Sequence, residues 1–163
     1  MRAPVDTEAR LSVREAGVRD AELLLSWRND PETRRWSRAS EVVPLADHVR
    51  WLESVLASAD RLLFVAEADG PVGTVRFDLV SDAPEGTWEV SITVAPECRG
   101  RGLAGAILAA GECELRRRQS ARCVLASVHE DNSASVALFR KAGYTGTETA
   151  GPFRVLTKPL ENA

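Results

Sequence analysis

A strand, a glycine-rich turn and a helix follow one another in the middle of this chain, and together they constrain the fold most. Apolar residues alternate with polar ones over residues 88–94, which predicts a strand with one polar face. Three glycines then fall within Arg99 to Gly105, and apolar residues recur at helical spacing over residues 103–115. This order favours a sheet covered by helices over an all-helical fold.

The remaining segments predict further strands and helices of a mixed α/β domain. Strands are expected at residues 11–15, 62–68, 72–80, 123–128, 144–149 and 153–157. Asp69-Gly70 predicts a tight hairpin between two of them. Helices are expected after Asp20 as a cap, from Pro31, from Pro44 and from about Ser133 to Ala142. In the helix from Pro44 the expected apolar face is Leu45, Val49, Leu52 and Leu56, with His48 and Trp51 off it.

Length and composition indicate one soluble domain spanning residues 1–163. The chain has 163 residues, of which 44% are hydrophobic and 28% charged, so its core needs no disulfide or metal. The net charge of −3 disfavours nucleic acid as a partner. Three cysteines without CxxC spacing favour a reducing cytoplasm and no metal site. Residues 1–11 lack an apolar core, and no apolar run is long enough for a membrane span, so neither a leader nor a membrane partner is expected.

The glycine-rich turn has several interpretations. Gly100, Gly102 and Gly105 satisfy G-x-G-x-x-G, the dinucleotide-binding pattern. Residues 96–99 separate the strand from these glycines, and no acidic residue ends the next strand, so we reject that interpretation. Ala106 after Gly105 excludes a P-loop, which requires lysine there. A plain helix entry does not explain two glycines flanked by arginines. Glycine-rich turns before helices also bind phosphate through free backbone N–H groups.

The stretch V-A-P-E-C-R-G-R-G-L-A, Val94 to Ala104, resembles the R/Q-x-x-G-x-G/A signature of the GNAT superfamily of acetyl-CoA-dependent N-acetyltransferases. A second block, N-x-x-S-x-x-L-F-R-K-x-G-Y from Asn132 to Tyr144, resembles the downstream motif of the same superfamily. The resemblance implies an α/β (α+β) fold with a central mixed, mostly antiparallel sheet and helices on both faces. It also implies acetyl-CoA as the acyl donor.

The resemblance further implies where acetyl-CoA would bind. The pyrophosphate would lie on the turn Arg99, Gly100, Arg101, Gly102, Leu103 and Ala104. The pantetheine arm would lie between the strands near Ile92, Val94 and Leu125, with Asn132, Ser135 and Phe139 near the thioester. Asn132 is equally explained as a helix cap alone, because Asp131-Asn132-Ser133 offers three capping residues.

Amine acetylation requires a base, a polarised carbonyl and a proton for the departing thiolate. Glu89 on the polar-faced strand is the preferred base, directly or through water, with Ser91 as a weaker catalytic candidate. A solvent-facing glutamate is the alternative for Glu89. Many members of the superfamily carry tyrosine where this chain has Phe139, so the thiolate's acid is open between water, Ser135 and Tyr144.

The acceptor is expected to be a small-molecule amine. Residues 27–36 and 48–52 are similar to members that acetylate nucleotide-linked amino sugars in the pseudaminic-acid pathway, and less closely to those that acetylate protein N-termini. Arg28, Asn29, Trp36, His48 and Trp51 are the candidate acceptor-binding residues. The alternative is that the tryptophans pack in the core and the arginines face solvent. A non-catalytic acyl-CoA-binding domain is the alternative of another class. A monomer or homodimer is expected.

Overall fold

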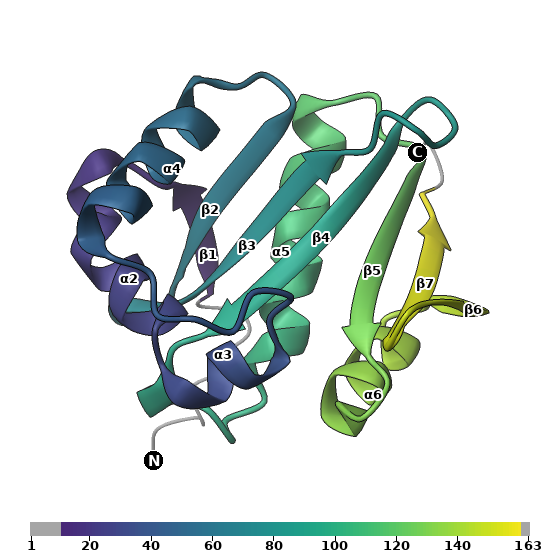
Figure 1. Ribbon diagram of the computed structural model, residues 1–163. Coiled ribbons are helices and arrows are strands. Elements are labelled where there is room, and N and C mark those ends of the chain that lie inside the picture. The colour runs from purple at the N-terminus through teal and green to yellow at the C-terminus, as the bar shows by residue number, and fades with distance from the viewer. Residues whose placement is uncertain (1–10, 161–163) are drawn as a thin grey trace, which may run out of the picture.

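The computed structural model describes residues 11–160 and contains one seven-stranded sheet in the order β1-β2-β3-β4-β5-β7-β6 (Figure 1). The strands are β1 (Ser12–Glu15), β2 (Arg61–Glu67), β3 (Pro71–Leu79), β4 (Thr87–Val94), β5 (Cys123–His129), β6 (Thr145–Ala150) and β7 (Phe153–Pro159). All neighbours are antiparallel except β4 and β5. The expected mixed, mostly antiparallel sheet is confirmed, whereas the expectation for the first ten residues lies outside the described part.

Five α-helices and two short 3₁₀ turns connect these strands in the described part of the chain. They are η1 (Val18–Asp20), α2 (Ala21–Arg28), α3 (Pro31–Trp36), α4 (Leu45–Ala57), η2 (Pro96–Cys98), α5 (Leu103–Arg118) and α6 (Ser133–Lys141). In Figure 1, α2 and α4 lie in front of the sheet and α5 lies behind it. Helices therefore cover both faces, as expected.

The packing of α5 on the sheet depends on a glycine. A Cβ added at Gly111 would lie 2.8 Å from both methyl groups of Val75 and 3.2 Å from the Phe77 ring. The glycine thus lets the helix backbone approach β3 closely. Because Val75 pairs with Ile92 and Phe77 with Val90, the apolar side chains of β4 also face α5. The polar side chains of β4 consequently face α2 and α4.

The hairpin between β2 and β3 forms as the sequence predicts. Asp69 has a φ of 58° and Gly70 a φ of 104°, both in the left-handed region, and Glu67 pairs with Pro71 across a register shift, so residues 68–70 form the turn. Pro31 occupies the first turn of α3, and Asp30 caps that helix by accepting hydrogen bonds from the backbone N–H groups of Glu32 and Thr33. The turn and the helix start thus form at the positions that the sequence predicts.

Two details of the sequence prediction were wrong. Asp20 precedes α2 but does not cap it, because its carboxylate accepts hydrogen bonds from Gly17 N and the Arg14 guanidinium. In α4 the buried side chains are His48, Leu52 and Val55, while Leu45 and Leu56 are exposed. The helix is rotated from the expected face so that the imidazole turns inward.

The parallel pair β4 and β5 is the irregular place in the sheet. Only three residue pairs join the two strands, from Thr87 with Cys123 to Glu89 with Leu125. Beyond Glu89 the strands diverge, and Figure 1 shows the gap widening toward their carboxyl ends. A sheet that opens in its middle leaves backbone groups on the facing edges without ladder partners.

Candidate active site

The opening between β4 and β5 is lined by peptide groups of β4. Ala95 N donates to Val72 O at 2.8 Å on the β3 side, and hydrogen-bonded pairs alternate along an antiparallel ladder. The peptide groups of Ile92 and Val94 therefore face the β5 side, beyond the last pair at Glu89 and Leu125. Both residues are half-buried. This edge offers N–H donors and C=O acceptors to an extended ligand between the strands.

The glycine-rich turn presents an open backbone at the start of α5. Gly100 and Gly102 have φ values of 76° and 71°, in the left-handed region that favours glycine. A Cβ added at either position would meet no heavy atom within 4 Å, so the space beside the turn is free of protein atoms. No side chain caps the N-terminus of α5, whose first N–H groups are positioned to bind an anion. The turn thus fits a pyrophosphate.

Arg99 connects this turn to α3. Its Nη2 lies 2.6 Å from Asp30 Oδ2 and 2.9 Å from Thr33 Oγ1. Hydrogen bonding from Arg99 is the main cause that lowers the pKa of Asp30, followed by the backbone N–H groups that Asp30 caps. The Arg99 side chain therefore holds the turn to the start of α3, and its backbone N–H remains available to a ligand in the turn.

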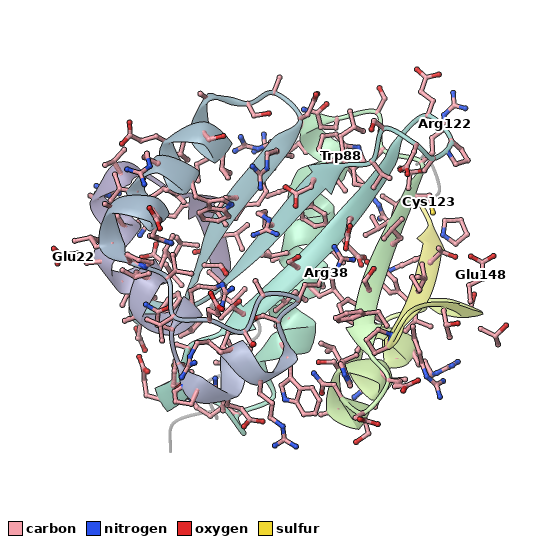
Figure 2. The ribbon with its side chains drawn as sticks, viewed as in Figure 1. Glu22, Arg38, Trp88, Arg122, Cys123 and Glu148 are labelled. Atoms are coloured by element: carbon pink, nitrogen blue, oxygen red, sulfur yellow. The ribbon has the colours of Figure 1, made fainter. Side chains whose placement is uncertain are left out.

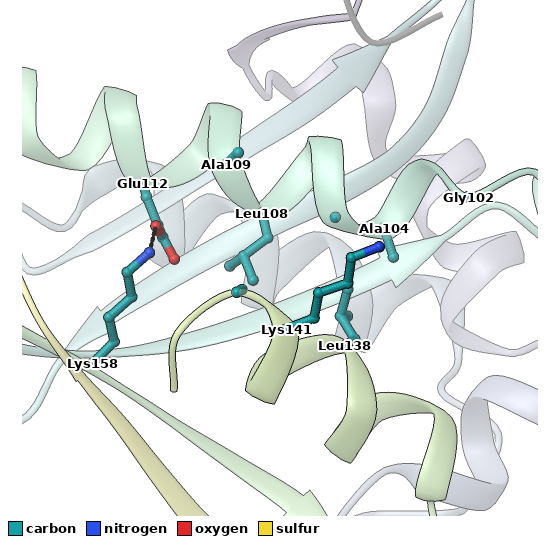
Figure 3. A pocket seen from close by; sticks show the side chains of 10 residues that line it. Gly102, Ala104, Leu108, Ala109, Glu112, Leu138, Lys141 and Lys158 are labelled. Atoms are coloured by element: carbon teal, nitrogen blue, oxygen red, sulfur yellow. Dashed lines mark hydrogen bonds and ion pairs between the residues drawn. The ribbon is translucent and has the colours of Figure 1, made fainter. Parts of the chain in front are cut away.

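A cavity of about 450 Å³ lies between α5 and α6, beside the turn (Figure 3). Gly102 and Ala104 line one end, and Lys141 extends toward this end in Figure 3. At the other end Lys158 Nζ lies 2.7 Å from Glu112 Oε1. The prediction did not assign Lys141 a role, although its place in the helical period one turn after Leu138 puts it on the same face.

The predicted residues of α6 lie at its start and on its buried face. Asn132 caps the helix, accepting a hydrogen bond from Ser135 N at 3.2 Å. Ser135 is half-buried in the first turn, and Phe139 is buried with its ring edge-on to Tyr144 at 5.1 Å between centroids. The Tyr144 hydroxyl donates to Glu112 Oε2 at 2.7 Å, and burial together with the Glu112 charge raises the pKa of Tyr144. Tyr144 is thus held in the core as a weak acid.

The polar face of β4 carries Glu89 and Ser91, both half-buried. Glu89 Oε2 accepts a hydrogen bond from Arg38 Nη2 at 3.0 Å in an ion pair across 51 positions of sequence. Figure 2 shows Arg38 in front of the sheet beside β4. Ser91 Oγ lies 3.5 Å from Arg76 Nη2, from the neighbouring position of β3. Sequence reasoning missed both arginines, although the alternation of β3 puts Arg76 on this face.

Two predicted residues at the end of α2, Arg28 and Asn29, hold the loop over residues 37–44 together with Arg34 of α3. Arg28 Nη2 donates to Ala39 O at 2.6 Å, and Arg34 Nη1 donates to Ser40 O at 3.2 Å. The Asn29 amide is paired with Val43, donating to its carbonyl at 2.9 Å and accepting from its N–H at 2.8 Å. Arg28, Asn29 and Arg34 thus have a structural role, which is to fix the loop that carries Arg38.

The predicted aromatic residues separate into two groups. His48 stacks on Trp51 at 5.5 Å between ring centroids, and Trp51 lies under Arg76 at 5.3 Å. Trp36 lies instead beside His129 at the end of β5, at 5.5 Å. The first group covers the polar face of the sheet, whereas Trp36 belongs to the carboxyl end of the opening.

No group of three or more metal-ligating side chains occurs within residues 11–160. No helix in that range is long and apolar enough to cross a bilayer.

Comparison with known proteins identifies relatives of this arrangement. A family model described as the acetyltransferase (GNAT) domain matches residues 10–145. The L-methionine sulfoximine/L-methionine sulfone acetyltransferase of Pseudomonas aeruginosa is 30% identical over 139 residues, which cover 82% of this chain and 79% of that protein.

Solved structures share the fold. The spermidine N-acetyltransferase of Vibrio cholerae, in complex with CoA and spermine, has a TM-score of 0.80 at 15% identity, covering 93% of this chain and 96% of that chain. Aminoglycoside acetyltransferase AAC(6')-Ib, in complex with ribostamycin and coenzyme A, has a TM-score of 0.78 at 20% identity, covering 91% of this chain and 93% of that chain.

Proposed function

The chain belongs to the GNAT family and is an acetyl-CoA-dependent N-acetyltransferase; we propose here which residues bind acetyl-CoA, which transfer the acetyl group, and what kind of amine receives it. The non-catalytic alternative is set aside, since the relatives are acetyltransferases by name.

Acetyl-CoA binds, in this proposal, through the turn and the opening of the sheet. The backbone N–H groups of residues 99–104 hold its pyrophosphate, supported by the open space beside Gly100 and Gly102. The peptide edge at Ile92 and Val94 holds the pantetheine arm opposite Leu125. Lys141, which lines the cavity between α5 and α6, supplies a cation for the phosphates. Asn132, Ser135 and Phe139 shape the far side of the opening.

Bound acetyl-CoA supplies the acetyl group as a thioester. Glu89 accepts the proton of the acceptor ammonium, directly or through one water, because its carboxylate lies where the β4–β5 ladder ends. The N–H of Ile92, on the edge facing the opening, polarises the acetyl carbonyl oxygen. Ser91 lies on the same face as Glu89 and orients the amine. Tyr144 donates to Glu112 in the core, so Ser135 or water protonates the thiolate.

The acceptor in this proposal is a small molecule with a primary amine. Relatives named for L-methionine sulfoximine, spermidine and aminoglycosides all act on small amines. A nucleotide-linked amino sugar fits the arginines near the acceptor face. A protein N-terminus is the second candidate acceptor. Arg28, Asn29 and Arg34 fix the loop over residues 37–44 above Glu89, which leaves less room for an extended peptide.

The observation that carries this proposal is the end of the ladder at Glu89, with the only glutamate of β4 at the opening of the sheet. The first experiment measures thermal unfolding with acetyl-CoA and with NAD. At a hundredfold excess over Kd a ligand adds about 2.7 kcal/mol, a shift on the order of 5–11 °C for this size. Release of CoA thiol with a panel of amines then tests acceptors. A shift with NAD alone, or with neither ligand, contradicts the proposal.

A further inference from the structure

Arg28 has an unsatisfied donor on the acceptor face of the sheet. Its Nη2 holds Ala39 O, but its Nη1 is buried and has no hydrogen-bond partner among the described residues. Burial lowers the pKa of Arg28, and the charges of Arg76 and Arg34 lower it further. A half-buried guanidinium with a buried, unpaired donor and two other cations nearby is unfavourable unless an anion joins them.

His48 supplies a second buried polar atom at the same place. Its side chain is 4% exposed, and its Nε2 is buried without a partner among the described residues. Burial and the charge of Arg28 lower the pKa of His48. Its ring stacks on Trp51, which also lies under Arg76. One cluster, formed by Arg28, Arg76, His48 and Trp51, therefore combines unpaired polar atoms with an aromatic wall.

Positive charge is in excess around this cluster. The arginines of this face outnumber the two carboxylates that pair with them, Asp78 and Glu89. These arginines are Arg28, Arg34, Arg38, Arg61 and Arg76. Asp78 is already shared between Arg61 and Arg76, at 3.0 Å from each, and Glu89 is paired with Arg38. Asp78 and Glu89 therefore leave the Arg28 Nη1 donor without a partner.

Arg76 fixes how far this cluster lies from the reacting amine. It is the cross-strand partner of Ser91, which precedes Ile92 and follows Glu89 by two positions. Side chains two positions apart on one face of a strand are about 7 Å apart. An anionic group held at Arg76 therefore lies within a few bonds of an amine that reaches both Glu89 and the Ile92 peptide. A short spacing of this kind fits a carboxylate on the amine-bearing carbon better than a distant diphosphate.

We infer that the cluster binds the carboxylate of the acceptor between Arg28 and Arg76, and that the acceptor is an α-amino acid or a close analogue. Paired N–H donors of arginine suit the two oxygens of a carboxylate. His48 and Trp51 cover the bound group and keep water from it. This inference rests on the proposed function and specifies its acceptor.

The test compares acceptors that differ only in the carboxylate. L-methionine sulfone, L-phenylalanine and L-leucine are each assayed by CoA-thiol release beside the amine that lacks the carboxylate, and a UDP-linked amino sugar is included. At least one amino acid is expected to have a kcat/KM about 100-fold above that of its decarboxylated partner, because an amine without the carboxylate leaves the buried Arg28 Nη1 donor unpaired. Equal kcat/KM values within every pair, or turnover of the UDP-sugar alone, overturn the inference.

Variants identify the residues responsible. Arg76→Gln is expected to raise KM for the amino acid about 10- to 100-fold and to remove the preference for it. Arg28→Gln is expected to have the same effect. If Arg28→Gln fails to fold because the loop at Ala39 loosens, Arg76→Gln alone tests the cluster. Arg50→Gln, on the exposed outer face of α4, is the matched control and keeps the preference. A preference unchanged in Arg76→Gln contradicts the assignment of this cluster.

The outcomes also separate this inference from the proposed function. Turnover of carboxylate-free amines alone contradicts the carboxylate site and leaves the acetyltransferase mechanism intact. Stabilisation by acetyl-CoA without turnover of any amino acid likewise counts against the inference only. Absence of both acetyl-CoA stabilisation and thiol release contradicts the proposed function, and the inference with it.

Discussion

Arg38 and Glu89 form an ion pair that joins the loop over residues 37–44 to the strand edge where the sheet opens. The Arg38 side chain is 62% exposed and that of Glu89 is 25% exposed, so solvent screens the pair and its contribution to stability is small. Arg38 also lies over the Phe153 ring on β7, at 5.6 Å. The same arginine thus reaches both sides of the opening, and an incoming ammonium competes with it for the Glu89 carboxylate.

Replacing Glu89 with glutamine tests its role as base. Glu89→Gln keeps the size of the side chain and a hydrogen bond to Arg38 but accepts no proton. We expect kcat to fall about 10²- to 10⁴-fold, while the thermal shift caused by acetyl-CoA stays the same. Glu148→Gln, on exposed β6, is the control and should leave both quantities unchanged. Turnover of Glu89→Gln at the original rate would remove Glu89 from the mechanism.

Local sequence patterns predicted most of the fold because they depend on near neighbours. Alternation in residues 88–94 defines β4, and glycine beside arginine marks the turn before α5. The face of α4 was mispredicted because tertiary contacts decided it: His48 turns inward and stacks on Trp51. Hydrophobic periodicity favours leucine for such a position and carries no information about a buried imidazole.

The candidate site was predictable only in part, for a related reason. Glu89 and Ser91 follow from the polar face of one strand. Arg38 approaches Glu89 from a loop 51 positions away, and Arg76 approaches Ser91 through strand pairing. No spacing rule links such residues, because the order of strands in the sheet brings them together. The amide of Asn29, a candidate acceptor-binding residue, is paired with the backbone of Val43, which the sequence alone does not reveal.

Gly102 tests the turn as the pyrophosphate site. Gly102→Ala adds a side chain at a φ of 71°, which costs about 1 kcal/mol and lowers Tm by roughly 2–4 °C. The new methyl group also projects into the space beside the turn, so KM for acetyl-CoA should rise about tenfold. Gly151→Ala is closely matched, with a φ of 60° and no atom within 4 Å of the added Cβ. It should lose similar stability and keep its KM; an equal KM in both variants would argue against the turn.

Asp20 links stability to pH. Hydrogen bonds from Arg14 are the main cause that lowers the pKa of Asp20, assisted by the Gly17 N–H. A lowered folded-state pKa stabilises the protein fully above the unfolded value near 3.9, and this contribution disappears as the pH falls through the folded value. Asp20→Asn should therefore cost about 1–3 kcal/mol at pH 7 by urea unfolding, and the difference from wild type should shrink below about pH 4.

The control for Asp20 is a carboxylate whose ion pair is exposed. Asp47 pairs with Arg50 on α4, where the two side chains are 55% and 71% exposed. Asp47→Asn should change the free energy of unfolding by less than about 0.5 kcal/mol, both at pH 7 and at pH 3. A loss in Asp20→Asn that is equal at pH 7 and at pH 3 would show that packing, rather than the carboxylate charge, accounts for its effect.

Tyr144 and Glu112 give the last prediction, which separates a structural role from a catalytic one. The tyrosine is fully buried and donates to Glu112, whose other oxygen pairs with Lys158. Glu112→Ala leaves a buried hydroxyl and the Lys158 charge without their partner, so we expect a loss of about 3–5 kcal/mol in urea unfolding. Tyr144→Phe should cost only about 1 kcal/mol and leave kcat within about twofold of wild type.

A double-mutant cycle with both changes should show a coupling of about 0.5–3 kcal/mol, because the two side chains share one hydrogen bond. The pH dependence of kcat in Tyr144→Phe completes the test. If the alkaline limb and the maximum of this pH profile match those of wild type, Tyr144 has only a structural role, as the hydrogen-bond donor to Glu112. A large fall in kcat at unchanged stability would instead make Tyr144 the acid that protonates the thiolate.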